Sequence, residues 1–197
     1  MQQKNKINLY RMTVCGMMAA LSVVLVILVH FPIIPAAPYL EYDAADIPVL
    51  ITAFAVGPIS GMAVLFVVSL VQAFLLGGNG IIGFVMHFAA SGFLVLISSL
   101  IYRRKKNLSS LIIGLALGSL VMTAAMIPLN IIFTPILFST PVEAVVKLVI
   151  PVLIPFNLIK SVANSVISFA VYSAVKRPIS AFVKRYLPEN EDRHSGV

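Results

Sequence analysis

Charged residues are scarce in this chain of 197 residues. They make up 11% of the sequence, whereas 60% of the residues are hydrophobic, and the mean hydropathy is +1.04. A soluble globular domain has an apolar content of only ~45–50%. The composition therefore excludes a soluble domain and predicts an integral membrane protein.

Cysteine and the common catalytic motifs are also missing. Cys15 is the only cysteine, which excludes a disulfide bond within the chain. The sequence has no GxxxxGK[ST] loop, no HExxH motif, no Cys and His pairs at metal-binding spacing and no GxSxG turn. We therefore expect no metal site, and nothing here indicates nucleotide hydrolysis or a familiar hydrolase.

Six apolar runs divide the chain, and several exceed the ~18–20 residues that cross a bilayer. The runs cover residues 12–30, 47–56, 59–77, 81–102, 109–138 and 149–175. Gly57 and Pro58 separate the short second run from the third, because both residues break helices. We predict an all-α integral membrane protein, a single bundle of six transmembrane helices over residues 1–186, with a polar cytoplasmic tail at 187–197. Five helices, or one re-entrant segment, are the alternatives.

Basic residues mark one side of the predicted bundle. The basic cluster at 103–106 and the basic residues near both termini fall on the same side if the chain crosses six times. The opposite loops carry four acidic residues and, among basic residues, only Lys147. Because positive loops stay in the cytoplasm, we expect cytoplasmic N- and C-termini in a bacterial cell membrane. The net charge of +7 then reflects membrane anchors and not a nucleic-acid surface.

Three polar residues interrupt the last apolar run. Asn157, Lys160 and Asn164 are three and four positions apart, which places them on one face of a helix. A charge near the middle of a membrane helix costs at least ~2.5 kcal/mol, so such residues usually face the bundle interior and mark a substrate path. We interpret this face as a substrate site; the alternative is a polar contact that joins two helices. Because an isolated buried charge destabilises a fold, this view predicts that Lys160→Met leaves the empty protein no less stable.

Further candidate substrate contacts lie near the predicted outer ends of the helices. Pro128 should kink the fifth helix beside Asn130, and irregular backbone at membrane depth is tolerated where it lines a cavity, so Asn130 is expected to join the site. The loop between the first two helices contains three prolines, so we expect an extended segment that acts as an outer lid.

The segment after this loop combines aromatic and acidic residues. Tyr39, Glu41 and Tyr42 are expected to contact a ligand, because aromatic rings combine flat apolar contact with a polar tip. We expect Asp46 to cap the second helix. His87 in the fourth helix is expected to form a hydrogen bond between helices and not to bind a metal.

Small residues on the first helix indicate a close helix contact. Gly16 and Ala20, with Ala19 beside them, form a pattern that lets another helix approach closely. That helix belongs either to this bundle or to a different subunit.

Three strings carry a resemblance to a known family. They are LEYDAADIP at 40–48, GPISG at 57–61 and PFNLIK at 155–160. Over residues 10–175 the chain resembles the substrate-binding S component of energy-coupling factor (ECF) vitamin transporters, most closely the riboflavin-specific branch. The resemblance implies a six-helix bundle that binds a vitamin under the outer lid, with Asn157 and Lys160 among the residues that hold riboflavin.

The same resemblance implies partners. Gly16, Ala19 and Ala20 would meet a membrane coupling subunit, and two ATPase subunits bound to it would supply the energy. The chain itself would be neither an enzyme nor dependent on a cofactor, and riboflavin would be its transported ligand. One departure is that riboflavin members often carry a Lys-Asn pair where this chain has Val68 and Ser69. Pantothenate, whose carboxylate suits Lys160, is the alternative substrate, and a membrane enzyme using Lys160 with Glu41 or Asp43 is a more distant one.

Overall fold

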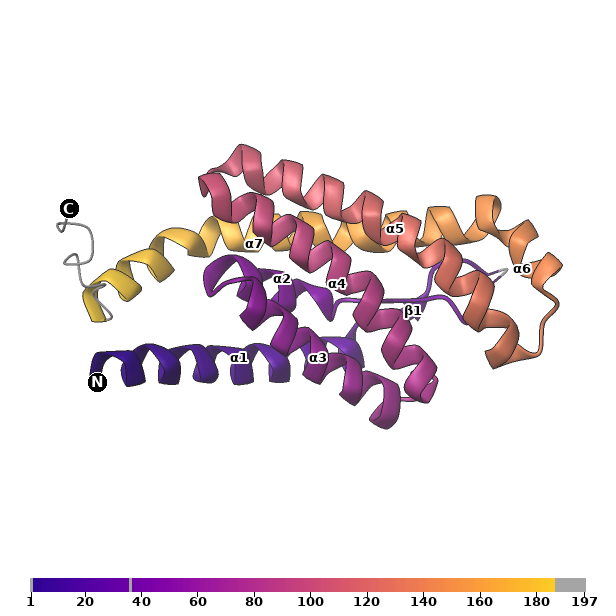
Figure 1. The fold of residues 1–197 in the computed structure, drawn as a ribbon, viewed down its shortest axis with the longest axis horizontal. Coiled ribbons are helices and arrows are strands. Elements are labelled where there is room, and N and C mark those ends of the chain that lie inside the picture. Colours follow the sequence, from indigo (N-terminus) through magenta and orange to yellow (C-terminus); the bar gives the residue numbers. More distant parts are fainter. Residues whose placement is uncertain (1, 36, 187–197) are drawn as a thin grey trace, which may run out of the picture.

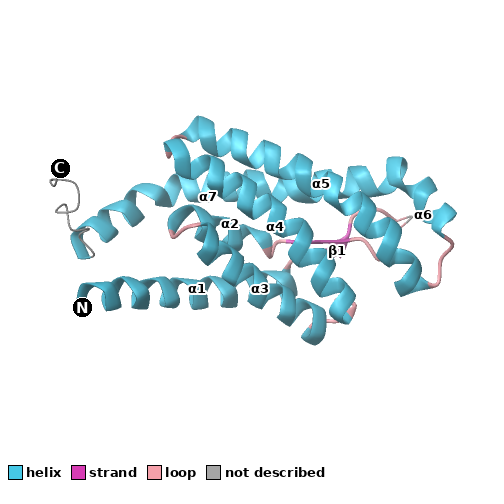
Figure 2. Ribbon diagram, in the orientation of Figure 1, coloured by secondary structure: helices cyan, strands magenta, loops and turns pink. Residues whose placement is uncertain are grey.

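Helices dominate the fold of the computed structural model, which describes residues 2–35 and 37–186 (Figures 1 and 2). Five helices are long and apolar enough to cross a membrane, and a shorter apolar helix lies between the first two of them. The main helices are α1 (Gln2–Leu28), α2 (Asp46–Ala55), α3 (Pro58–Leu75), α4 (Gly80–Lys105), α5 (Leu108–Phe138) and α7 (Ile154–Tyr186). The predicted all-α membrane bundle of six helices is confirmed, and the predicted tail at 187–197 lies outside the described residues.

The helical segment that leads into α7 begins at Val142, before the apolar run predicted at 149–175. A short helix, α6 (Val142–Leu148), continues through a π-helical turn, η1 (Val149–Leu153), directly into α7. Pro151 and Pro155 fall in or beside this turn, and each lacks the N–H that a regular α-helix needs. The wider turn lets the helical path continue past both prolines, so α6, η1 and α7 form one long element.

A β-hairpin that the sequence did not predict forms between α1 and α2. Strand β1 (His30–Pro32) pairs antiparallel with β2 (Glu41–Asp43), and Phe31 lies opposite Tyr42. Strands of three residues are too short to show an alternating pattern, which explains why only an extended loop was predicted. The hairpin lies in the half of the molecule away from the start of α1 (Figure 1).

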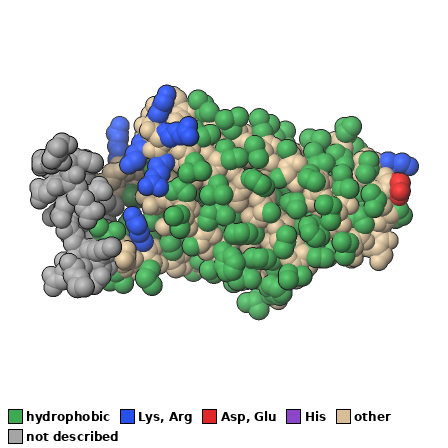
Figure 3. Space-filling view, in the orientation of Figure 1, with side chains coloured by type: hydrophobic (Ala, Val, Ile, Leu, Met, Phe, Trp, Pro, Cys, Tyr) green, Lys and Arg blue, Asp and Glu red, His purple; other side chains and the backbone are tan. Residues whose placement is uncertain are grey.

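The surface and the helix ends are consistent with a membrane-spanning bundle. The start of α1 and the end of α7 lie at the same end of the molecule, as an even number of crossings requires (Figure 1). Hydrophobic side chains cover most of the face shown in Figure 3, and Lys and Arg side chains gather near that same end. Exposed aliphatic residues such as Ile59 (84%) and Ile150 (79%) would be unfavourable in water and are suited to lipid.

Glycines bring α4 and α5 into backbone contact. A Cβ atom added to Gly114 would lie 2.7 Å from the Ser98 carbonyl oxygen, and one added to Gly118 would lie 2.9 Å from the Leu94 carbonyl oxygen. Small residues allow this approach, which is how membrane helices gain packing contacts without a hydrophobic driving force.

Gly16 and Ala20 on α1 make no such backbone contact with another helix of the described chain. Gly16 and Ala20 are exposed, and a Cβ added to Gly16 would meet no atom within 4 Å. Only Ala19 packs against the core. Packing of Gly16 and Ala20 within this bundle, one of the two sequence-based alternatives, is therefore wrong.

This contrast predicts that the same substitution has opposite effects at two helical glycines. Gly114→Ala should lower the free energy of unfolding by about 1–3 kcal/mol, because the added methyl group collides with the α4 backbone. Gly16→Ala should not destabilise, since the methyl group meets nothing and alanine favours helix. Thermal unfolding of both variants in detergent measures the difference, and equal midpoints would contradict the close α4–α5 contact.

Candidate ligand-binding site

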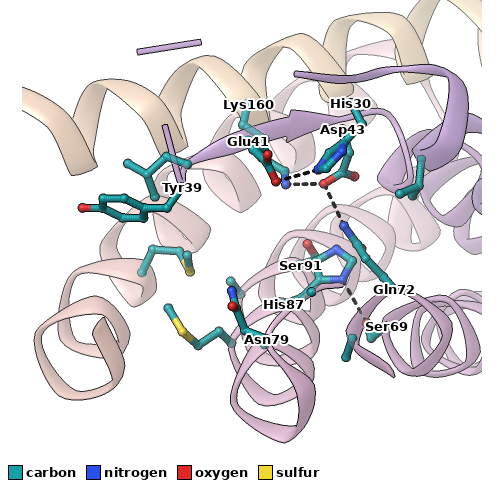
Figure 4. Close-up of a pocket in the computed structure, with 18 of the residues that line it drawn as sticks. His30, Tyr39, Glu41, Asp43, Ser69, Gln72, Asn79, His87, Ser91 and Lys160 are labelled. Atoms are coloured by element: carbon teal, nitrogen blue, oxygen red, sulfur yellow. Dashed lines mark hydrogen bonds and ion pairs between the residues drawn. The ribbon is translucent and has the colours of Figure 1, made fainter. Parts of the chain in front are cut away.

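A cavity of about 400 Å³ lies at the end of the bundle away from the 103–106 cluster. Its walls come from α1, the hairpin, α3, α4, α5 and the start of α7 (Figure 4). This volume is within the range of roughly 300–1,000 Å³ that is usual for small-molecule sites. The cavity is therefore large enough for a ligand and is built from residues far apart in the sequence.

An ion pair between α7 and the hairpin forms one wall. Lys160 Nζ lies 2.6 Å from Asp43 Oδ2, and the two side chains are only 12% and 2% exposed. The Ala45 N–H donates to Asp43 Oδ1, and Gln72 Nε2 donates to Asp43 Oδ2. Burial by itself would raise the pKa of Asp43, but the positive charge of Lys160 and the hydrogen bonds from Lys160 and Ala45 outweigh it and hold that pKa well below its usual range. Lys160 is therefore not the isolated charge that the sequence suggested.

A second polar network connects α2, α3 and α4 behind the ion pair. Asp46 accepts a hydrogen bond from Ser91 Oγ at 2.9 Å and lies 3.4 Å from His87 Nε2. His87 Nδ1 is 3.2 Å from Ser69 Oγ on α3, so the predicted hydrogen bond between helices is present. The predicted helix cap is wrong: Asp46 is the first residue of α2, and the helix has no side-chain cap. Its carboxylate is directed to α4 instead, where Ser91 and His87 replace the water lost on burial.

Five of the seven predicted substrate-contact residues line the cavity. They are Tyr39, Glu41, Asn130, Asn157 and Lys160. Glu41 is not a free carboxylate, however, because its Oε2 lies 2.8 Å from His30 Nε2.

Tyr42 and Asn164 are not among the lining residues. The Tyr42 hydroxyl donates to Asn164 Oδ1 at 2.8 Å, and Asn164 Nδ2 donates to the Asp43 carbonyl oxygen at 3.1 Å. Both bonds tie β2 to α7. These two side chains thus position the ion pair and do not face the cavity.

Two buried amide oxygens at the cavity wall have no hydrogen-bond partner among the described residues. Asn157 Nδ2 donates to the Leu153 carbonyl oxygen at 2.8 Å, which leaves Asn157 Oδ1 unpaired. Gln72 donates to Asp43 in the same way, which leaves Gln72 Oε1 unpaired. Since carbonyl and carboxylate oxygens only accept hydrogen bonds, both amide orientations are fixed by chemistry. Both residues line the cavity, so a small movement of either side chain would present its oxygen as an acceptor to N–H or O–H groups of a ligand.

The substrate site predicted from the sequence did not include Asp43 or Gln72. A buried lysine requires a counter-ion, and outside the last eleven residues the chain has only four acidic residues, all in the predicted outer loops. That scarcity was the available signal for Asp43. Gln72 carried no comparable signal, because a single glutamine on an apolar helix is compatible with many contacts.

The chain forms a membrane bundle with a partly polar cavity near one end. This fold and this cavity are those of a membrane-embedded ligand-binding protein. The model of the family described as "ECF transporter, substrate-specific component" matches residues 10–172. The chain belongs to this family, and it is accordingly a multi-pass membrane protein of a transport system.

Relatives and a solved structure agree with this family. The riboflavin transporter RibU of Staphylococcus aureus is 30% identical over 194 residues, which cover 94% of this chain and all of the relative. RibU of Streptococcus thermophilus is 31% identical over 80% of each chain. A structure described as the S component of a bacterial ECF transporter superposes with a TM-score of 0.73 at 31% identity, covering 90% of this chain and 99% of that one.

The ion pair changes the expected effect of removing Lys160. Lys160→Met leaves Asp43 charged, buried and without its cation, so the empty protein should lose about 3–5 kcal/mol of unfolding free energy. The double variant Lys160→Met/Asp43→Asn should recover most of that loss, because no unpaired charge remains. Unfolding midpoints of the two single variants and the double variant, measured without ligand, give the coupling energy.

The exposed pair His30–Glu41 supplies the control. Glu41→Gln should cost less than ~1 kcal/mol, since exposed ion pairs contribute little. Additive effects of Lys160→Met and Asp43→Asn would show that the buried pair does not act as a unit.

Proposed function

We propose that this chain is the riboflavin-binding subunit of an ECF-type uptake transporter in the bacterial cytoplasmic membrane. The observation that carries the proposal is the polar end of the cavity, where the unpaired Asn157 Oδ1 and the Lys160 ammonium lie on the same helix. The names of the similar proteins from Staphylococcus aureus and Streptococcus thermophilus support the same ligand.

A flavin matches the two kinds of surface in the cavity. Its pyrimidine edge alternates carbonyl oxygens with an imide N–H, so Asn157 Oδ1 can accept from the N–H while an ammonium donates to a carbonyl. Its flat ring system requires apolar walls. The cavity provides them with Met86, Met122, Met126, Leu137, Phe138 and Phe156.

The ion pair argues against pantothenate. The carboxylate of pantothenate would need a cation that has no other partner, whereas Lys160 is already neutralised by Asp43 at 2.6 Å. A second carboxylate at this position would be repelled by Asp43 and desolvated at the same time. A neutral ligand that only accepts a hydrogen bond from Lys160 avoids both penalties.

The hairpin is suited to act as the lid. Tyr39 and Glu41 line the cavity from this segment, and His30 holds Glu41 at 2.8 Å across the two strands. Strand β1 is exposed, whereas Tyr42 and Asp43 of β2 are buried and bonded to α7. Strand β1 should therefore open at lower free energy than β2 and the helices around it, which would provide a route for the ligand. The distribution of basic residues indicates cytoplasmic termini. The hairpin, at the opposite end of the bundle, would then open on the outer side of the membrane.

The energy for transport comes from partners in this proposal. A membrane coupling subunit carries two ATPase subunits, and this chain supplies only the ligand site. The exposed Gly16 and Ala20, with Ala19 beside them, form a flat strip on α1 that suits a helix of the coupling subunit.

Riboflavin binding gives the direct test of the ligand. Purified protein should quench flavin fluorescence at submicromolar flavin, and pantothenate should not compete. Asn157→Leu should weaken binding about five-fold to more than a hundred-fold, because one buried hydrogen bond to the ligand is lost. Ile150→Phe, an exposed site outside the cavity, should bind normally. Flavin binding that Asn157→Leu leaves unchanged would contradict the proposed site.

Partner docking should be separable from ligand binding. Gly16→Leu and Ala20→Leu should block assembly with the coupling subunit and transport, since the new side chains project from the exposed face of α1. Flavin affinity should remain within about two-fold of the parent protein, because the cavity does not contain either residue. Co-purification of the subunits and flavin titration measure the two effects, and equal loss of both would assign these residues to the fold instead.

A further inference from the structure

A second cavity of about 500 Å³ lies at the opposite end of the bundle from the ligand site. Its walls come from α1, the turn between α2 and α3, the end of α4 and the last turns of α7. Four basic residues line it: Arg11, Arg103, Lys106 and Lys176. No acidic residue is among the lining residues, so the cavity has an uncompensated positive charge within the described part of the chain.

The basic side chains are available to a ligand. Arg11, Arg103 and Lys106 are exposed, and in residues 2–35 and 37–186 none of the four forms an ion pair. Lys176 is fixed in place, because its ammonium donates to the Lys106 carbonyl oxygen at 2.8 Å and lies 5.2 Å from the centre of the Tyr102 ring. One cation is thus preorganised at the wall, and three others can close around an anion.

The base of the cavity is rigid and aromatic. Tyr102 and Tyr172 share a hydrogen bond at 3.2 Å, and the Tyr172 hydroxyl donates to the Phe54 carbonyl oxygen. The Phe54 ring packs against both tyrosine rings. Apolar side chains of Ile7 and Ile179 complete the lining. The cavity therefore combines cations with apolar walls, a combination suited to an amphiphile more than to a free inorganic anion.

The position of the cavity fits a membrane interface. The apolar spans begin at Ile7 on α1, end at Lys105 on α4 and end at Ala181 on α7, so the cavity residues lie in the terminal turns of three spans. Basic pockets between helices at this depth bind anionic lipid headgroups, and anionic lipids are enriched in the cytoplasmic leaflet. The Lys and Arg side chains in Figure 3 gather at this end of the molecule.

We propose that this basic cavity binds the phosphate headgroup of one anionic phospholipid, with its acyl chains on the adjoining apolar surface of the bundle. The arginines supply paired N–H donors to the phosphate oxygens, and Lys176 supplies a fixed positive charge. A bound lipid would bridge α1 to α4 and α7 at this end, and so stabilise the bundle. The site is independent of the identity of the transported ligand.

The test compares two double variants with the same loss of charge. Arg103→Gln/Lys106→Gln removes two cavity cations, and Arg104→Gln/Lys105→Gln removes two exposed cations from the same helix end that do not line the cavity. Dioleoylphosphatidylglycerol is titrated into each protein in detergent, and native mass spectrometry counts retained lipid. The parent protein should retain one lipid. The cavity variant should bind about twenty-five-fold more weakly, since each cation contributes about five-fold, and the control should change by less than about two-fold.

Further measurements distinguish an anionic lipid from a zwitterionic lipid and from free phosphate. Dioleoylphosphatidylcholine should not replace the bound lipid, and inorganic phosphate should not compete at equal concentration; competition by either would overturn the proposal. Arg11→Gln alone should weaken binding about five-fold, and circular dichroism melting verifies that each variant is folded. Equal losses in both double variants would indicate only general surface charge. Unchanged lipid retention together with impaired subunit assembly would assign the cavity to an acidic partner segment and would also overturn the proposal.

Discussion

The ion pair between Lys160 and Asp43 is the interaction on which the ligand-binding half of the protein depends. It joins α7 to the hairpin, and Gln72 on α3 and the Ala45 N–H complete the coordination of the same carboxylate. A buried charge without a partner is strongly destabilising, so the hairpin is held against the helices by the requirement to neutralise Lys160. The ligand cavity is the space left around this pair.

In the proposed function, the pair would also determine which kind of ligand the cavity accepts. A lysine paired with an aspartate presents hydrogen-bond donors but little net charge, which favours a neutral polar edge over an anion. The unpaired Asn157 Oδ1 and Gln72 Oε1 add acceptors. In the proposed function, specificity would arise from donors and acceptors that are unsatisfied until a ligand arrives, because a mismatched ligand would leave them buried and unpaired.

The two ends of the bundle use charge in different ways. At the ligand end, the described acidic and basic side chains near the cavity are paired, as in Lys160–Asp43 and His30–Glu41. At the other end, Arg11 and Arg103 have no acidic partner in the described part of the chain. Between them, Gly114 and Gly118 bring α4 and α5 into backbone contact.

The sequence by itself determined the membrane class, the helix boundaries to within a few residues at most ends and the polar face of α7. These features depend on local properties, since hydropathy and helical spacing are read over a short window. The motif-based resemblance to the S components is confirmed by the family match. The exposed position of Gly16 and Ala20 was left open, because a small-residue pattern is the same whether its partner is inside or outside the chain.

Only the tertiary structure decided which residues share the site. Asp43 and Lys160 are 117 positions apart, and nothing local distinguishes Asp43 from Glu41 or Asp46 as the counter-ion. The hairpin register directs Tyr42 to Asn164 and away from the cavity, and a shift of one residue would have reversed that assignment. The partner of a buried charge is fixed by how the helices pack, and packing is a property of the whole bundle and of no single segment.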